Sequence, residues 1–152
     1  MNTENKLVIE RILNAPRERV WEACTKPEEL HKWWGQPKDA TTPVFEVDVR
    51  VGGSLHFKVL LPDGNVVWGK AIYKDIVANE KLVLEDHYSD EQGRLLDTPE
   101  LPSSTITIIL ESEGNKTRLT IVHEGLGGGE HTLAQYKEGW SQVFNRLKAT
   151  LS

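Results

Sequence analysis

Sulfur-containing residues are nearly absent from this sequence of 152 residues, which has one cysteine and one methionine. A single thiol, that of Cys24, cannot form an internal disulfide, and this usage predicts a reducing compartment, the cytoplasm. No run of about 18 apolar residues occurs, so no membrane insertion is predicted. The polar stretch 1–6 also lacks the apolar core of a secretory signal.

Basic residues are in the minority: 18 Lys and Arg stand against 23 Asp and Glu, for a net charge of −5. Nucleic acids and anionic membranes are bound through clustered Lys and Arg, so neither is a predicted partner. The five histidines are scattered without zinc-ligand spacing, and we predict no metal site and no cofactor. Serine-elbow and zinc-protease motifs are missing as well, so no catalytic residue is assigned.

Most of the chain favours β-strands, because apolar and polar residues alternate with a period of two. In the stretch 45–51, for example, four apolar residues alternate with Glu, Asp and Arg. Two short helices are predicted after the first strand, beginning near Pro16 and Pro27, since proline is favoured in the first turn of a helix. The predicted strands cover residues 6–14, 45–51, 55–59, 66–76, 81–88, 105–111 and 117–124.

The 22 residues 130–151 predict one long amphipathic helix. Its apolar side chains step by three and four residues and form one stripe: Leu133, Tyr136, Trp140, Val143, Phe144, Leu147 and Leu151. At about 1.5 Å per residue this helix is roughly 30 Å long and can cross a sheet. The prediction is an α+β fold, in which a curved antiparallel sheet of six to seven strands wraps around the C-terminal helix. One domain covers 6–151, and residues 1–5 are expected to be disordered.

Four blocks of residues are characteristic of one protein family. They are Arg11, Leu13, Ala15, Pro16, Arg17, Val20, Trp21, Ala23, Thr25, Pro27, Glu28, Leu30, Trp33, Trp34, Gly35 and Pro37; Asp48, Arg50, Gly52 and Gly53; Pro62, Asp63 and Gly64; and Gly139 with Trp140. The chain from Lys6 to Leu151 closely resembles the activator-of-heat-shock-protein-90-ATPase-like family, within the START-like (SRPBCC) superfamily.

The resemblance implies a helix-grip (START/Bet v-like) fold around an apolar tunnel. Members of the superfamily bind lipids, sterols, polyketides or plant hormones, and a few are cyclases or hydrolases. The co-chaperones that name the family imply a link to chaperones and the stress response.

Ligand-binding residues are predicted from position and residue type. Trp34 must point away from its neighbour Trp33, and it is the better cavity residue of the pair. Inward alternation places Asp86 and Tyr88 on one strand and His123 on another, where they could orient a polar ligand group. The alternative is that these three are rim residues that reach solvent, and that the tryptophans only pack. The remaining predicted lining residues are Trp68, Leu133, Tyr136, Trp140 and Phe144.

Three functions follow from these observations. The first is a carrier or sensor that binds a small hydrophobic molecule, lipid-like or aromatic, in an internal cavity. The second is a chaperone-associated protein that acts through its outer surface. The third is a cyclase- or hydrolase-like enzyme, in which His123 and Asp86 would form a general-base pair. Dimerisation through an exposed strand edge is compatible with the pattern, so the chain is expected to be a monomer or a homodimer.

Overall fold

The computed structural model describes residues 6–34, 39–96, 98, 103–125 and 129–151, with the backbone alone at 129–133. The segment 1–5, predicted to be disordered, lies outside these residues. In chain order the elements are β1 (Leu7–Leu13), α1 (Arg17–Thr25), α2 (Pro27–Leu30), β2 (Thr41–Val47), β3 (Ser54–Leu60), β4 (Val66–Val77), β5 (Lys81–Tyr88), β6 (Ser104–Glu113), β7 (Lys116–Glu124) and α3 (Gly129–Leu151).

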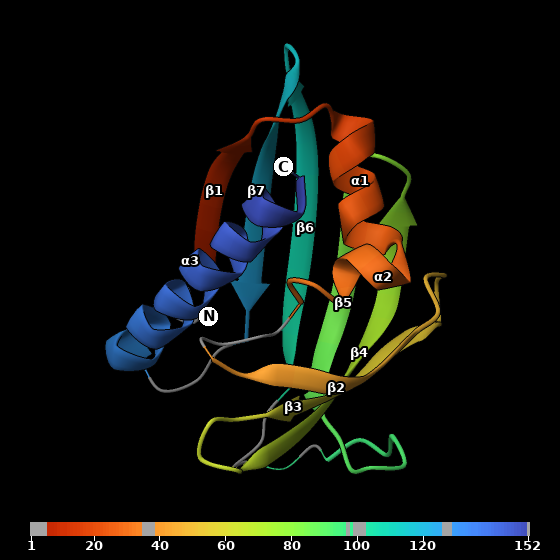
Figure 1. The fold of residues 1–152 in the computed structure, drawn as a ribbon, viewed down its shortest axis with the longest axis vertical. Helices are drawn as coiled ribbons and strands as arrows, with labels where there is room; N and C mark the ends of the chain where they lie inside the picture. The colour runs from red at the N-terminus through yellow and green to blue at the C-terminus, as the bar shows by residue number, and fades with distance from the viewer. Residues whose placement is uncertain (1–5, 35–38, 97, 99–102, 126–128, 152) are drawn as a thin grey trace.

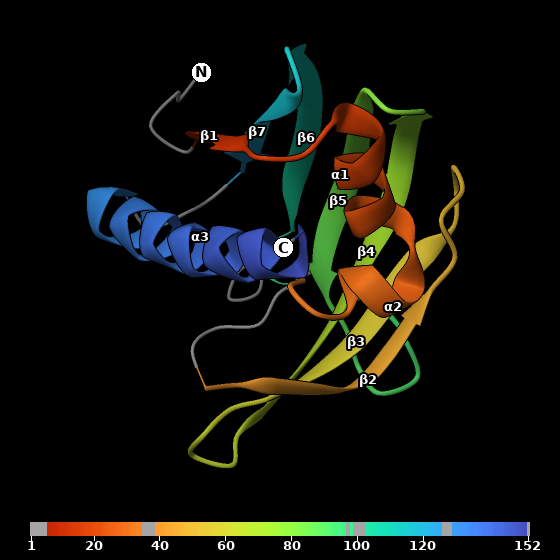
Figure 2. The same ribbon diagram turned by 45° about the horizontal axis from the view of Figure 1, so that its top comes forward.

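The seven strands form one antiparallel sheet in the order β1-β7-β6-β5-β4-β3-β2. All three helices lie on the same side of this sheet (Figure 1), with α3 packed against β1 and with α1 packed against β6, β7 and α3. The sheet curls, so that β2 and β3 turn toward the side on which the helices lie (Figure 2). The predicted helix-grip α+β fold is confirmed.

Alternation along the strands determines which side chains face the helices. In β3, Leu55 and Phe57 are buried while Ser54 and His56 on the other face are partly accessible. The same two-residue period along most of β4 to β7 places a largely apolar surface under the helices. The C-terminal half of α3 fills the groove above it, and Leu147 is 1% exposed. Burial of one such side chain contributes roughly 1.5–3 kcal/mol.

The strand predicted over 45–51 is displaced toward the N-terminus, since β2 runs from Thr41 to Val47. Val51, the last apolar residue of that predicted alternating stretch, is 60% exposed and belongs to a turn. The turn closes early because the amide of Asp48 already donates to the carbonyl of Ser54. Gly52 has φ +85°, which L residues rarely adopt, so the chain reverses there.

Candidate functional site

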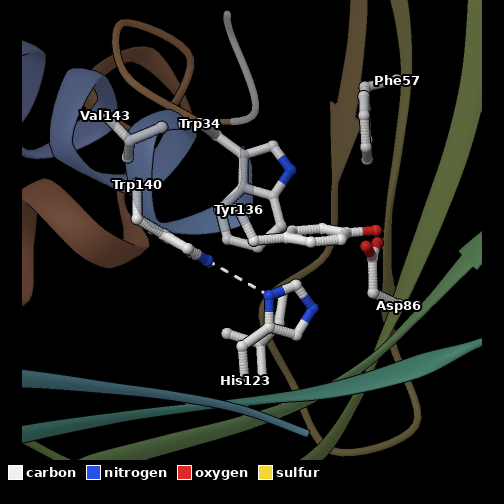
Figure 3. A pocket seen from close by; sticks show the side chains of 9 residues that line it. Trp34, Phe57, Asp86, His123, Tyr136, Trp140 and Val143 are labelled. Atoms are coloured by element: carbon white, nitrogen blue, oxygen red, sulfur yellow. Dashed lines mark hydrogen bonds between the residues drawn. The ribbon is translucent and has the colours of Figure 1, made fainter. Parts of the chain in front are cut away.

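A cavity of about 200 Å³ lies between α3 and the curled sheet. Its described lining is mostly aromatic and aliphatic and includes one acidic residue, Asp86 (Figure 3). The lining residues are Trp34, Phe57, Asp86, Ile106, His123, Tyr136, Gly139, Trp140 and Val143. They come from the segment after α2, from four strands and from α3, so the site exists only in the folded chain.

The aromatic ring of Phe57 forms one wall and depends on a glycine opposite it. Phe57 on β3 is paired with Gly69 on β4. A Cβ atom at Gly69 would lie 2.5 Å from the ring atom Cζ of Phe57, closer than real Cβ contacts. The ring therefore lies directly over the β4 backbone, and any side chain at Gly69 would push it into the cavity.

The adjacent residues Trp33 and Trp34 have different environments. Trp33 is 0% exposed and its indole N–H donates to the carbonyl of Ala23 at 2.8 Å, which fixes α1 to the segment after α2. Trp34 lines the cavity and packs edge-on against Phe57, with ring centroids 6.4 Å apart and an interplanar angle of 82°. Trp34 is 4% exposed, yet its Nε1–H has no acceptor among the described residues.

His123 lies at the floor of the cavity with both ring nitrogens engaged. Nδ1 accepts a hydrogen bond from Trp140 Nε1 at 3.1 Å, and Nε2 lies 2.8 Å from Ser104 Oγ. Because an indole N–H can only donate, the single proton of the neutral ring is on Nε2 and is donated to Ser104. Burial lowers the pKa of His123 to about 4, so the imidazole is neutral at pH 7.

Asp86 faces the cavity from β5 as a half-buried side chain. Burial raises the pKa of Asp86 to about 7, and the neighbouring charge of His87 opposes this only in part. The Tyr136 hydroxyl is directed toward the Asp86 carboxyl (Figure 3). The pKa of Tyr136 is raised, first by burial and then by the negative charges of Tyr88 and Asp86.

Asp86 and His123 share the cavity but do not form a general-base pair. No hydrogen bond joins them in the described part of the chain, and His123 uses its basic nitrogen to accept from Trp140. A general base needs a free ring nitrogen within hydrogen-bond reach of the proton that it removes.

Five of the nine predicted lining residues face the cavity: Trp34, Asp86, His123, Tyr136 and Trp140. Tyr88 lies near Tyr136, but it is at the rim and 36% exposed. Phe144 is 3% exposed and packs in the core, where the guanidinium of Arg11 lies 5.3 Å from its ring centroid. The side chain of Leu133 lies outside the described residues.

The assignment of Trp68 to the cavity is wrong. Its indole stacks on His56 with centroids 5.1 Å apart, and Lys58 Nζ lies 5.8 Å from its ring. These residues are on the outer face of the sheet, because in β4 the inward positions are the buried Gly69, Ala71 and Tyr73.

Four lining residues were missed by sequence reasoning: Phe57, Ile106, Gly139 and Val143. Phe57 belonged to a predicted alternating strand, and its inward position could have identified it. Gly139 carries no such signal, because a glycine on a helix reveals its role only through the space beside it. A Cβ atom built there meets nothing within 4 Å.

Neither a membrane-spanning helix nor a metal cluster occurs among the described residues. No helix there is long and apolar enough to cross a bilayer. No group of three or more His, Cys, Asp and Glu side chains among them comes close enough to hold a metal ion.

Comparison with known proteins agrees with this architecture. A protein from Chromobacterium violaceum, CV1439, is 29% identical, with 97% of this chain and 96% of that chain aligned at a TM-score of 0.81. Ms6760 from Mycobacterium smegmatis is 26% identical, with coverages of 98% and 91% and a TM-score of 0.81. No protein of curated function matches significantly. The model of the family "Activator of Hsp90 ATPase homolog 1-like protein" matches residues 14–152. The chain therefore belongs to the Activator of Hsp90 ATPase homolog 1-like family.

Proposed function

We propose that this protein binds a small, compact, mostly apolar molecule in the cavity beneath α3, as a carrier or a sensor. The observation that carries the proposal is the cavity of about 200 Å³ with its aromatic and aliphatic wall. Ligand sites in proteins are typically apolar hollows with a few polar groups that orient the ligand.

The volume favours a ring compound over a long acyl chain or a sterol. An engineered apolar cavity of about 150 Å³ accepts a benzene ring. A space of about 200 Å³ therefore suits a molecule of one or two rings. Aromatic walls from Trp34, Phe57, Tyr136 and Trp140 offer faces and edges to such a ring.

The partly buried carboxyl group of Asp86 gives independent support for ligand binding. Holding a carboxyl group in an apolar pocket is unfavourable, as its raised pKa reflects, and an apolar residue of similar size would be more stable there. Titratable groups with strongly perturbed pKa values cluster at functional sites. A role in orienting a ligand accounts for a carboxyl group at this position.

The test fills the cavity without weakening the fold. Gly139→Leu adds a side chain where a Cβ atom meets nothing within 4 Å. Replacing a helical glycine by leucine also favours the helix by up to about 1 kcal/mol, so the variant should stay folded. Glu138→Leu adds the same side chain to the exposed neighbouring position of α3 and is the matched control.

Native mass spectrometry measures binding by the wild type and both variants. Each protein is examined freshly purified and again after exposure to a library of one- and two-ring compounds. We expect bound mass with the wild type and Glu138→Leu, and its loss with Gly139→Leu. Equal binding by all three proteins would place the ligand elsewhere. An association with a chaperone that survives in Gly139→Leu, with no ligand found, would favour action through the outer surface.

A further inference from the structure

Two polar groups at the cavity have no partner within the described part of the chain. The Nε1–H of Trp34 is a buried donor without an acceptor. The carboxyl of Asp86 receives no hydrogen bond and forms no ion pair there. An unpaired buried polar group such as the Trp34 N–H costs roughly 1–3 kcal/mol, so a ligand that accepts a hydrogen bond from it gains affinity.

The remaining nitrogen donors and acceptors at the cavity are already used. The Trp140 N–H donates to His123 Nδ1, and His123 Nε2 is bonded to Ser104. Recognition of a polar ligand group thus depends on Trp34 and Asp86, with the Tyr136 hydroxyl beside the carboxyl (Figure 3).

The charge of the wall restricts the ligand further. None of the described residues that line the cavity is Lys or Arg, so an anionic ligand would face Asp86 without a compensating cation from them. A cationic ligand would pair with Asp86 and the aromatic faces, but it would leave the Trp34 N–H without an acceptor. A neutral group that both donates and accepts can pair with both residues.

We propose that the ligand is a neutral one- or two-ring molecule whose polar group, a hydroxyl or an amide, accepts from Trp34 and hydrogen-bonds to Asp86. This inference rests on the proposed function and specifies the ligand class of the same cavity. The ring fills the aromatic part of the pocket, and the polar group lies at its Asp86 end.

Five probes with one ring system test the polar group alone. They are 2-naphthol and 2-naphthamide, which donate and accept; 2-methylnaphthalene, which does neither; 2-naphthoate, an anion; and 2-naphthylmethylamine, a cation at neutral pH. Affinities come from isothermal titration at pH 7. We expect 2-naphthol or 2-naphthamide to bind about tenfold more tightly than 2-methylnaphthalene, as one recovered hydrogen bond implies. Which of the two binds better distinguishes a hydroxyl from an amide ligand.

The Trp34 indole resonance reports the proposed hydrogen bond directly. In two-dimensional ¹H–¹⁵N spectra of the wild type, this N–H should move downfield with 2-naphthol and not with 2-methylnaphthalene. Trp34→Phe assigns the signal, keeps an aromatic wall, and should lower 2-naphthol affinity about tenfold while sparing 2-methylnaphthalene. Trp68→Phe, on the outer face of the sheet, is the matched control and should change neither affinity.

The outcomes separate this inference from the proposed function. Equal affinity for 2-naphthol, 2-naphthamide and 2-methylnaphthalene would overturn the inference and leave a purely apolar binding site. Tightest binding of 2-naphthylmethylamine would also overturn it, in favour of a cation site. Failure of all five probes, together with no ligand in native mass spectrometry, would overturn the proposed function itself.

Discussion

Replacing Asp86 by asparagine should stabilise the protein at alkaline pH and leave its stability almost unchanged at pH 4. Burial raises the pKa of Asp86 from 3.8 to about 7. Between these values the folded protein keeps a proton that the unfolded chain has released. The contribution of Asp86 to stability therefore falls as pH rises from about 4 to 7 and stays low above that range. Asparagine resembles the protonated side chain and does not titrate.

The size of the effect follows from the pKa and from the position of the carboxyl group. The difference between these folded-state and unfolded-state pKa values corresponds to about 4 kcal/mol of folding free energy for a fully desolvated group. Asp86 is half-buried and faces a cavity, where water screens part of its charge. We therefore expect Asp86→Asn to be about 1–2 kcal/mol more stable than the wild type at pH 8.

Urea unfolding of both proteins, measured from pH 4 to 8.5, checks this prediction. The lowered pKa of His123 acts in the opposite direction, because stability is lost as pH falls below the unfolded-state pKa of histidine toward 4. That contribution is present in both proteins and cancels in their difference. Asp75→Asn, at an exposed ion pair with Lys81, should show no such pH-dependent gain. A difference that is constant with pH, or a less stable Asp86→Asn at pH 8, would refute the reasoning.

Three further predictions concern the walls of the cavity and the core. Gly69→Ala should displace the Phe57 ring, lower the free energy of unfolding by about 1–3 kcal/mol in urea titrations, and weaken ligand binding. Trp140→Phe should cost about 1–3 kcal/mol in the same assay, because the buried Nδ1 of His123 loses its donor. Burial raises the pKa of Cys24 to about 12, so a thiol reagent at pH 8 should label it only after unfolding.

Helix α3 divides into two regions with different roles. Its C-terminal half buries Val143, Phe144 and Leu147 and fills the curl of the sheet. One turn earlier, Gly139 has no side chain and leaves open space where a larger residue would pack. Gly139 therefore leaves room on the α3 side of the cavity.

Strand periodicity predicted the inward positions of Asp86 and His123, because alternation depends only on local backbone geometry. The same alternation also predicts where Trp68 lies. Ala71 and Tyr73 are inward residues of β4, and Trp68 has the opposite parity, so it lies on the outer face. The error came from choosing Trp68 by residue type instead of by its place in the alternation.

The sequence by itself determined the class of fold, a sheet of six to seven strands, the long C-terminal helix and the family, since these depend on local periodicity, turn residues and contiguous blocks. Only the tertiary structure decided which side chains enclose a cavity and which of their polar groups remain unpaired. Trp140 and Ser104 occupy the two nitrogens of His123 from other elements, and Trp34 keeps a free N–H. These pairings join residues far apart in the chain, and their distances arise only when the sheet curls around the helix.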